Sequence, residues 1–131
     1  SFIKDMSSET PDTPTYIFVR DKISKYKLNI DINSKAVKDG IIEVNIILKF
    51  LDQPEILKKA YFEITYTSIV KVDENVSDKK EMEKIILCDV PNKIYPDLER
   101  IFLNLLTDSG YPGVKFEKKI DFTDLYKKRT N

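Results

Sequence analysis

The sequence predicts an α+β fold in which a four-stranded antiparallel sheet packs with a long C-terminal helix and short helices. Apolar and polar residues alternate with a period of two through three stretches between residues 26 and 72, and this alternation is typical of half-buried strands. After residue 90 the apolar spacing changes to that of a helix. The length of 131 residues is typical of one domain, so we expect a single domain over residues 1–131.

The strands are expected in the following order. Residues 1–9 alternate loosely and end at TPDTP, whose two prolines favour a loop. Residues 26–32 form the clearest strand, and the turn SKAVKDG joins it to a second strand at 41–51. The turn DQPEI leads to a third strand at about 59–72, so these three strands are expected to form a meander. The earlier segment TYIFVRDKISKY fits either a strand end or a short helix.

The C-terminal part of the chain is expected to be helical. A charged linker, DENVSDKKEMEK, precedes an apolar piece at 85–88. Pro96, with acids after it, predicts the first turn of a long helix, because proline lacks an amide that would be unpaired there. Gly110 fits the position just after the end of this helix, and Asp121 fits the cap of a short last helix. The long helix has one apolar stripe, formed by Leu98, Ile101, Phe102, Leu105 and Leu106.

The second strand is apolar on both faces. Ile46 and Leu48 lie on one face, and Ile47 and Leu51 lie on the other. Because one layer of helices covers only one face, we expect the remaining apolar surface to be a ligand site or to be buried by a second copy of the chain. The third strand adds to this surface, so the residues predicted at a contact between subunits are Phe62, Ile64 and Tyr66.

The composition excludes several kinds of chemistry. The chain contains no histidine, which excludes Ser-His-Asp and Cys-His catalysis and zinc sites that use imidazole. The three glycines are too widely spaced to form a phosphate-binding loop. The 22 basic residues balance the 22 acidic residues, so we expect no nucleic-acid partner. We also expect no cofactor and no metal.

The single cysteine, Cys88, lies in the apolar segment EKIILCDV. It cannot form an internal disulfide, and its surroundings favour a buried, unreactive thiol over a nucleophile. No apolar run reaches the roughly 18 residues that a membrane helix needs, and we expect no secretory leader. These observations predict a cytoplasmic protein without direct membrane insertion.

A carboxylate-dependent hydrolase is the enzymatic alternative. Asp121 and Asp124 are three residues apart, which places both on one face of a helix. The same two residues fit a helix cap and first turn at least as well. We therefore expect a protein that is not an enzyme.

Several segments resemble the SecB family of bacterial protein-export chaperones. The N-terminal FIKDMSSETP is similar to the first strand of that family. The segments PNKIYP, DSGYP and IDFTDLY follow one another in the order and spacing of its C-terminal half. The middle of the chain agrees in its strand pattern. The resemblance implies a SecB-like chaperone domain that assembles as a dimer of dimers, which is a homotetramer.

The resemblance also implies a function. SecB proteins bind unfolded precursor proteins in the cytoplasm and deliver them to the SecA motor for export, without a cofactor. A SecB-like chaperone dedicated to one partner, such as an antitoxin, is the second interpretation. Carried over by position, the SecA-binding residues are Asp5, Glu9, Tyr61 and Glu63. The aromatic residues implied to contact unfolded clients are Tyr95, Tyr111, Phe116, Phe122 and Tyr126.

Overall fold

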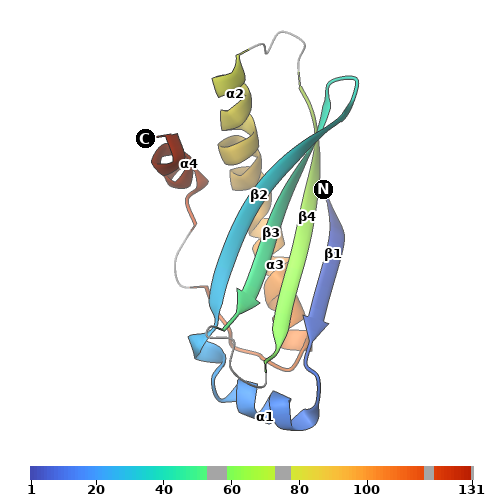
Figure 1. Cartoon of the computed structure of the whole chain (residues 1–131), viewed down its shortest axis with the longest axis vertical. Helices are drawn as coiled ribbons and strands as arrows, with labels where there is room; N and C mark the ends of the chain where they lie inside the picture. The colour runs from blue at the N-terminus through green and yellow to red at the C-terminus, as the bar shows by residue number, and fades with distance from the viewer. Residues whose placement is uncertain (53–58, 73–77, 117–119, 131) are drawn as a thin grey trace.

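The computed structural model describes residues 1–52, 59–72, 78–116 and 120–130 (Figure 1). Within these residues, four strands form one antiparallel sheet in the order β1-β4-β3-β2. The strands are β1 (Phe2–Glu9), β2 (Lys27–Lys38), β3 (Ile41–Leu51) and β4 (Tyr61–Lys71). The helices are α1 (Thr13–Arg20), η1 (Ile23–Lys25), α2 (Lys79–Lys84), η2 (Ile85–Asp89), α3 (Val90–Asp108) and α4 (Phe122–Thr130). The predicted α+β class and the antiparallel sheet are confirmed.

The strands β2, β3 and β4 form the predicted meander. β3 has the predicted bounds, but β2 extends well beyond them. Residues 34–38, which were expected to form a turn, belong to β2 because they pair with the start of β3. The turn itself is short, and Asp39 and Gly40 have φ angles of 51° and 75°. The expected turn DQPEI lies almost entirely outside the described residues.

The segment that fitted two alternatives forms helix α1, which crosses one end of the sheet (Figure 1). Asp12 caps this helix, since its Oδ1 accepts a hydrogen bond from the amide of Thr15 at 2.8 Å. Pro14 lies in the first turn, where its missing amide costs nothing. Val19 is buried on the inner side of the helix. The hydroxyl of Tyr16 donates to the carbonyl of Gly110 at 2.8 Å and so ties α1 to the end of α3.

The long helix begins earlier than predicted. Helical structure continues from α2 through the π-helical η2 into α3, so Pro96 lies inside α3 and not in its first turn. The N-terminal cap is Asp78, whose Oδ1 accepts from the amide of Lys80 at 3.0 Å. Ile94 and Leu98, on either side of the proline, are both buried at helical spacing. Burial of this stripe offsets the hydrogen bond that proline cannot make.

The C-terminal end of α3 is as predicted. Gly110 has a φ angle of 101°, a conformation that glycine adopts without strain. The amide of Tyr111 donates to the carbonyl of Leu106 at 2.9 Å, which closes the helix. A Cβ at position 110 would lie 2.5 Å from the Tyr16 ring, so the contact with α1 also requires glycine.

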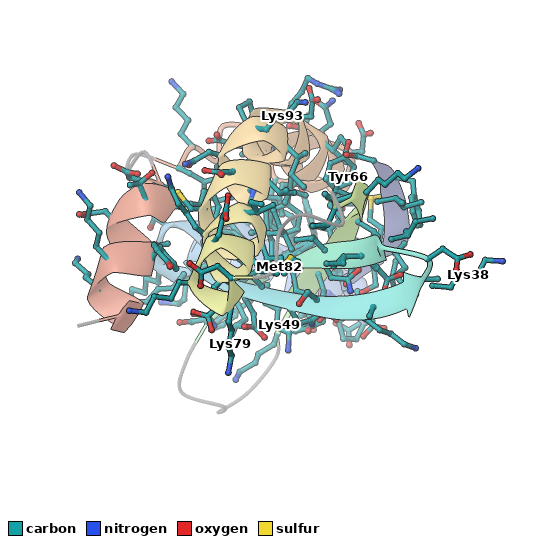
Figure 2. All side chains as sticks on the ribbon, turned by 90° about the horizontal axis from the view of Figure 1, so that it is seen from above. Lys38, Lys49, Tyr66, Lys79, Met82 and Lys93 are labelled. Carbon is teal, nitrogen blue, oxygen red and sulfur yellow. The ribbon has the colours of Figure 1, made fainter. Side chains whose placement is uncertain are left out.

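The core lies between α3 and one face of the sheet, called here the inner face. Leu98, Phe102 and Leu106 of α3 are fully buried. Figure 2 shows Tyr66 on the side of the sheet that faces the helices, whereas Lys38 projects away from the fold at the end of the β2–β3 hairpin. The sheet contributes Val44, Ile46, Leu48, Phe50, Phe62, Ile64 and Tyr66.

The expectation that Phe62, Ile64 and Tyr66 contact another subunit therefore needs correction. All three side chains are buried within the chain itself, and all three belong to its hydrophobic core. A charged side chain at Ile64 would disrupt this core, so it would not report on assembly.

Helix α4 docks on η2 and α3 through its first residues. Asp121 caps the helix as predicted, because its Oδ1 accepts from the amide of Thr123 at 2.9 Å. Phe122 is fully buried, and its ring lies 5.4 Å from that of Tyr95. Asn92 joins the two helices by donating to Thr123 Oγ1 at 3.1 Å. Cys88, buried as predicted, lies 3.1 Å from the same oxygen and thus packs within this junction.

Candidate functional site

A groove of about 870 Å³ lies along the β2 side of the sheet. One wall comes from η1 and from the inner face of β2, and the other comes from residues 112–116 and from Ile120. The lining is mainly apolar, with Lys27 and Lys115 also bordering the groove. Its apolar side chains include Ile23, Leu28, Ile30, Val114, Phe116 and Ile120.

The groove is anchored to the core at Tyr26 and Phe116. The hydroxyl of Tyr26 donates to the carbonyl of Ala60 at 3.0 Å and accepts from its amide at 3.1 Å. The Phe116 ring meets the Phe50 ring edge-on at 5.7 Å and stacks on the Phe102 ring at 6.2 Å. Phe116 is only partly buried, so one side of its ring remains open to the groove. These contacts pre-form an apolar surface that can accept other apolar side chains.

The strand β2 is an edge strand of the sheet. Within the described part of the chain, its only paired neighbour is β3. The backbone amides and carbonyls on its other side can therefore pair with an added extended segment. Together, the edge and the groove can bind a stretch of polypeptide through backbone hydrogen bonds and apolar side-chain contacts.

The structure separates the five aromatic residues that were predicted to contact clients. Phe116 lines the groove, whereas Tyr95, Tyr111 and Phe122 are buried in the core of the chain. Tyr126 lies on α4, where its hydroxyl donates to the carbonyl of Lys80 at 3.4 Å. Phe116 and Tyr126 are both partly exposed, but of these two only Phe116 lines the groove.

Sequence reasoning missed the β2 side of the groove. The alternation from residue 26 onward shows that Leu28 and Ile30 share the inner face. Both residues are only partly buried, although they pack against the core. No local pattern indicates that α3 leaves this edge incompletely covered, because the path of α3 over the sheet is a tertiary property. The spacing of aliphatic residues could have identified these residues as candidates, but it could not have separated them from the core.

The four residues predicted to bind SecA lie together on the opposite face of the sheet, called here the outer face. Strand pairing places Glu9 opposite Tyr61 and Ser7 opposite Glu63. Asp5 pairs with Thr65, two residues farther along the same face. Because directly paired residues point to the same side of a sheet, Asp5, Glu9, Tyr61 and Glu63 share one surface.

The charges of this surface are only partly compensated. Glu63 lies 3.7 Å from the ammonium group of Lys49. Within the described residues, Asp5 and Glu9 form no ion pair. Partial burial and a hydrogen bond with Glu63 raise the pKa of Tyr61 to about 12, so its hydroxyl stays protonated at neutral pH. Among the described residues, the surface thus presents two carboxylates without an ion pair beside a neutral aromatic ring.

The described residues contain no group of three or more acidic, cysteine or histidine side chains that could hold a metal ion. None of the helices in this part of the chain is long and apolar enough to cross a membrane.

Comparisons with known proteins identify the family of the chain. The family model described as "Preprotein translocase subunit SecB" matches residues 1–131. The chain belongs to the SecB family. A SecB protein-export protein of Pelagibacter ubique is 92% identical over 131 residues, which are 100% of this chain and 94% of that protein. The protein-export protein SecB of Parvibaculum lavamentivorans is 28% identical over 130 residues, covering 98% of this chain and 74% of the relative.

A solved structure shares the fold. It is a SecB-like chaperone of Mycobacterium tuberculosis in complex with a ChAD peptide from the HigA1 antitoxin. The TM-score is 0.56 at 13% sequence identity, and the match covers 91% of this chain and 86% of the other. With its SecB fold and family, the chain is a protein-export chaperone and not an enzyme. The carboxylate hydrolase is thereby set aside, in agreement with the role of Asp121 as a helix cap.

Proposed function

We propose that this SecB-family chain binds unfolded precursor proteins in its groove, in the cytoplasm, and delivers them to SecA. The observation that carries the proposal is that two different surfaces lie on opposite faces of one sheet. The apolar groove borders the inner face at the β2 edge, and the carboxylates lie on the outer face of β1 and β4. A client and a motor protein can therefore be bound at the same time without competing for the same residues.

The groove is tested with Phe116→Ala. The remaining groove loses one aromatic contact, so we expect the dissociation constant of a chemically unfolded client to rise about tenfold. Leu125→Ala is the matched control, since Leu125 is an exposed apolar residue on α4 and does not line the groove. Binding should be measured well below the unfolding temperature, because Phe116 also packs on the core. Equal client affinity in the two variants would refute the groove as the client site.

The carboxylate surface is tested with Asp5→Lys and Glu9→Lys together. Reversing both charges replaces attraction by repulsion, so SecA binding should be lost while suppression of client aggregation is retained. Binding of the unchanged protein to SecA should weaken as salt is added, because exposed charges are screened. Protection of a single partner, with no SecA binding at any salt concentration, would instead favour a dedicated chaperone.

We also propose a homotetramer built as a dimer of dimers. Its support is the uncovered inner side of β1, where Ile3 and Met6 are 43% and 45% exposed. A second chain beside this edge strand would bury both residues. Met6→Glu should therefore reduce the molar mass measured by light scattering, with Leu125→Glu as the control. A monomer of the unchanged protein at micromolar concentration would contradict this assembly.

A further inference from the structure

Lys4 lies in a β-bulge beside the carboxylate surface. Ile3 pairs with Tyr66 on the inner face, and Asp5 pairs with Thr65 on the outer face. Strand β1 therefore advances by two residues while β4 advances by one, and Lys4 is the extra residue. Bulges re-aim side chains in this way. Lys4 and Asp5, although adjacent in sequence, both border the same hollow on the outer face.

The ammonium group of Lys4 is held by Glu43 of β3. Its Nζ lies 3.1 Å from Glu43 Oε1 and donates to it. The side chain of Lys4 is 48% exposed and that of Glu43 only 18%. Glu43 is thus the more fixed member of the pair.

Glu43 is itself positioned by a hydrogen-bonded network. Asn45 Nδ2 donates to Glu43 Oε2 at 3.2 Å and to Asn33 Oδ1 at 2.9 Å. Asn45 is buried, and its Oδ1 accepts from the hydroxyl of Thr67 at 2.6 Å. The network with Lys4 thereby includes residues from all four strands. The hydrogen bond from Asn45, together with Lys4, holds the pKa of Glu43 below its usual range.

Two carboxylates on this face could attract Lys4. Asp5 borders the same hollow, but within the described residues it forms no ion pair. A surface ion pair stabilises a protein little, because ordering two flexible side chains costs entropy. A carboxylate that is already held in place avoids part of that cost, so a flexible lysine contacts it in preference to a mobile one. Glu43 has that advantage because Asn45 fixes its carboxylate.

We propose that Glu43 is a positioning residue that holds Lys4 away from Asp5. The carboxylate of Asp5 is then left uncompensated and free to bind a cationic segment of a partner protein. Without Glu43, the ammonium group of Lys4 would turn to Asp5 and neutralise part of the carboxylate surface. This inference rests on the proposed function, and it concerns the docking step only.

The test compares three variants of the full chain by their association rate with purified SecA at low salt. Glu43→Gln should slow association by about threefold to tenfold, because electrostatic steering depends on uncompensated charge. Lys4→Gln with Glu43→Gln should restore the rate, since the released lysine is absent. Lys35→Gln with Glu43→Gln is the control of equal net charge, because Lys35 lies opposite Glu43 in the sheet and leaves Lys4 in place. That control should remain slow.

Equal recovery in the two double variants would show that only net charge matters, and no recovery in either would mean that Glu43 contacts the partner directly. Both results overturn the proposal. A crystal structure of the Glu43→Gln variant separates this inference from the proposed function. It should show Lys4 Nζ within ion-pair distance of Asp5, whether or not SecA binds. A lysine that stays away from Asp5 in that structure would refute the positioning role by itself.

Discussion

Two buried tyrosines allow the same substitution to have opposite effects on stability. Within the described residues, the hydroxyl of Tyr95 is buried without a hydrogen-bond partner. The hydroxyl of Tyr26 is also buried, but it exchanges two hydrogen bonds with the backbone of Ala60. Replacing either residue by phenylalanine removes one oxygen and changes the apolar core little. The comparison therefore isolates the hydrogen bonding of that oxygen.

The expected magnitudes follow from these contacts. Burying an unpaired hydroxyl costs about 1–3 kcal/mol, so Tyr95→Phe should raise the free energy of unfolding by about 1 kcal/mol once the small void is allowed for. Tyr26→Phe loses two hydrogen bonds and, among the described residues, leaves the buried amide and carbonyl of Ala60 without these partners. It should lower the free energy of unfolding by about 2 kcal/mol or more.

The assay is urea unfolding followed by circular dichroism, at equal concentration of chains because the proposed assembly would contribute to stability. Client binding should be unchanged in Tyr95→Phe, since that residue lies in the core. The reasoning fails if Tyr95→Phe destabilises the protein as much as Tyr26→Phe does. That result would mean that the Tyr95 hydroxyl has a partner in solution.

Two other predictions concern the outer face and α4. The pKa of Tyr61 is raised from 10.0 to about 12, so the folded state holds this proton more tightly and stability should fall as the pH rises through that window. Tyr61→Phe should reduce this loss of stability at high pH, which is measured as the melting temperature against pH. An unchanged profile would contradict the raised pKa of Tyr61. Asn92→Ala removes the hydrogen bonds to Thr123 and to the amide of Phe122. We expect the free energy of unfolding to fall by about 1–2 kcal/mol and proteolysis near α4 to become faster. Asn29→Ala is the control, because Asn29 is an exposed residue on β2, and it should change neither quantity.

Local patterns were sufficient for much of the fold. Alternation assigned β3 with its observed bounds, and Gly110 and Asp121 marked a helix end and a helix start as observed. Pro96 misled the prediction, because a proline near acidic residues resembles a first turn. Burial of Ile94 and Leu98 on the sheet keeps the helix continuous across the proline, and that burial is not visible in the local sequence.

The candidate sites depended more on tertiary structure. The family resemblance named Asp5, Glu9, Tyr61 and Glu63, but the pairing of β1 with β4 brings them onto one face. The groove arises because the inner side of β2 stays only partly covered.

The sequence by itself determined which residues alternate, where several turns and caps fall, and which chemistries the absence of histidine excludes. These properties depend on neighbours within a few residues, which the sequence lists directly. Only the tertiary structure decided that Phe62, Ile64 and Tyr66 are core, that Lys4 is re-aimed toward Glu43, and that Phe116 borders a groove. Each of these outcomes depends on strand register or on helix placement over the sheet, and both are set by contacts between residues distant in sequence.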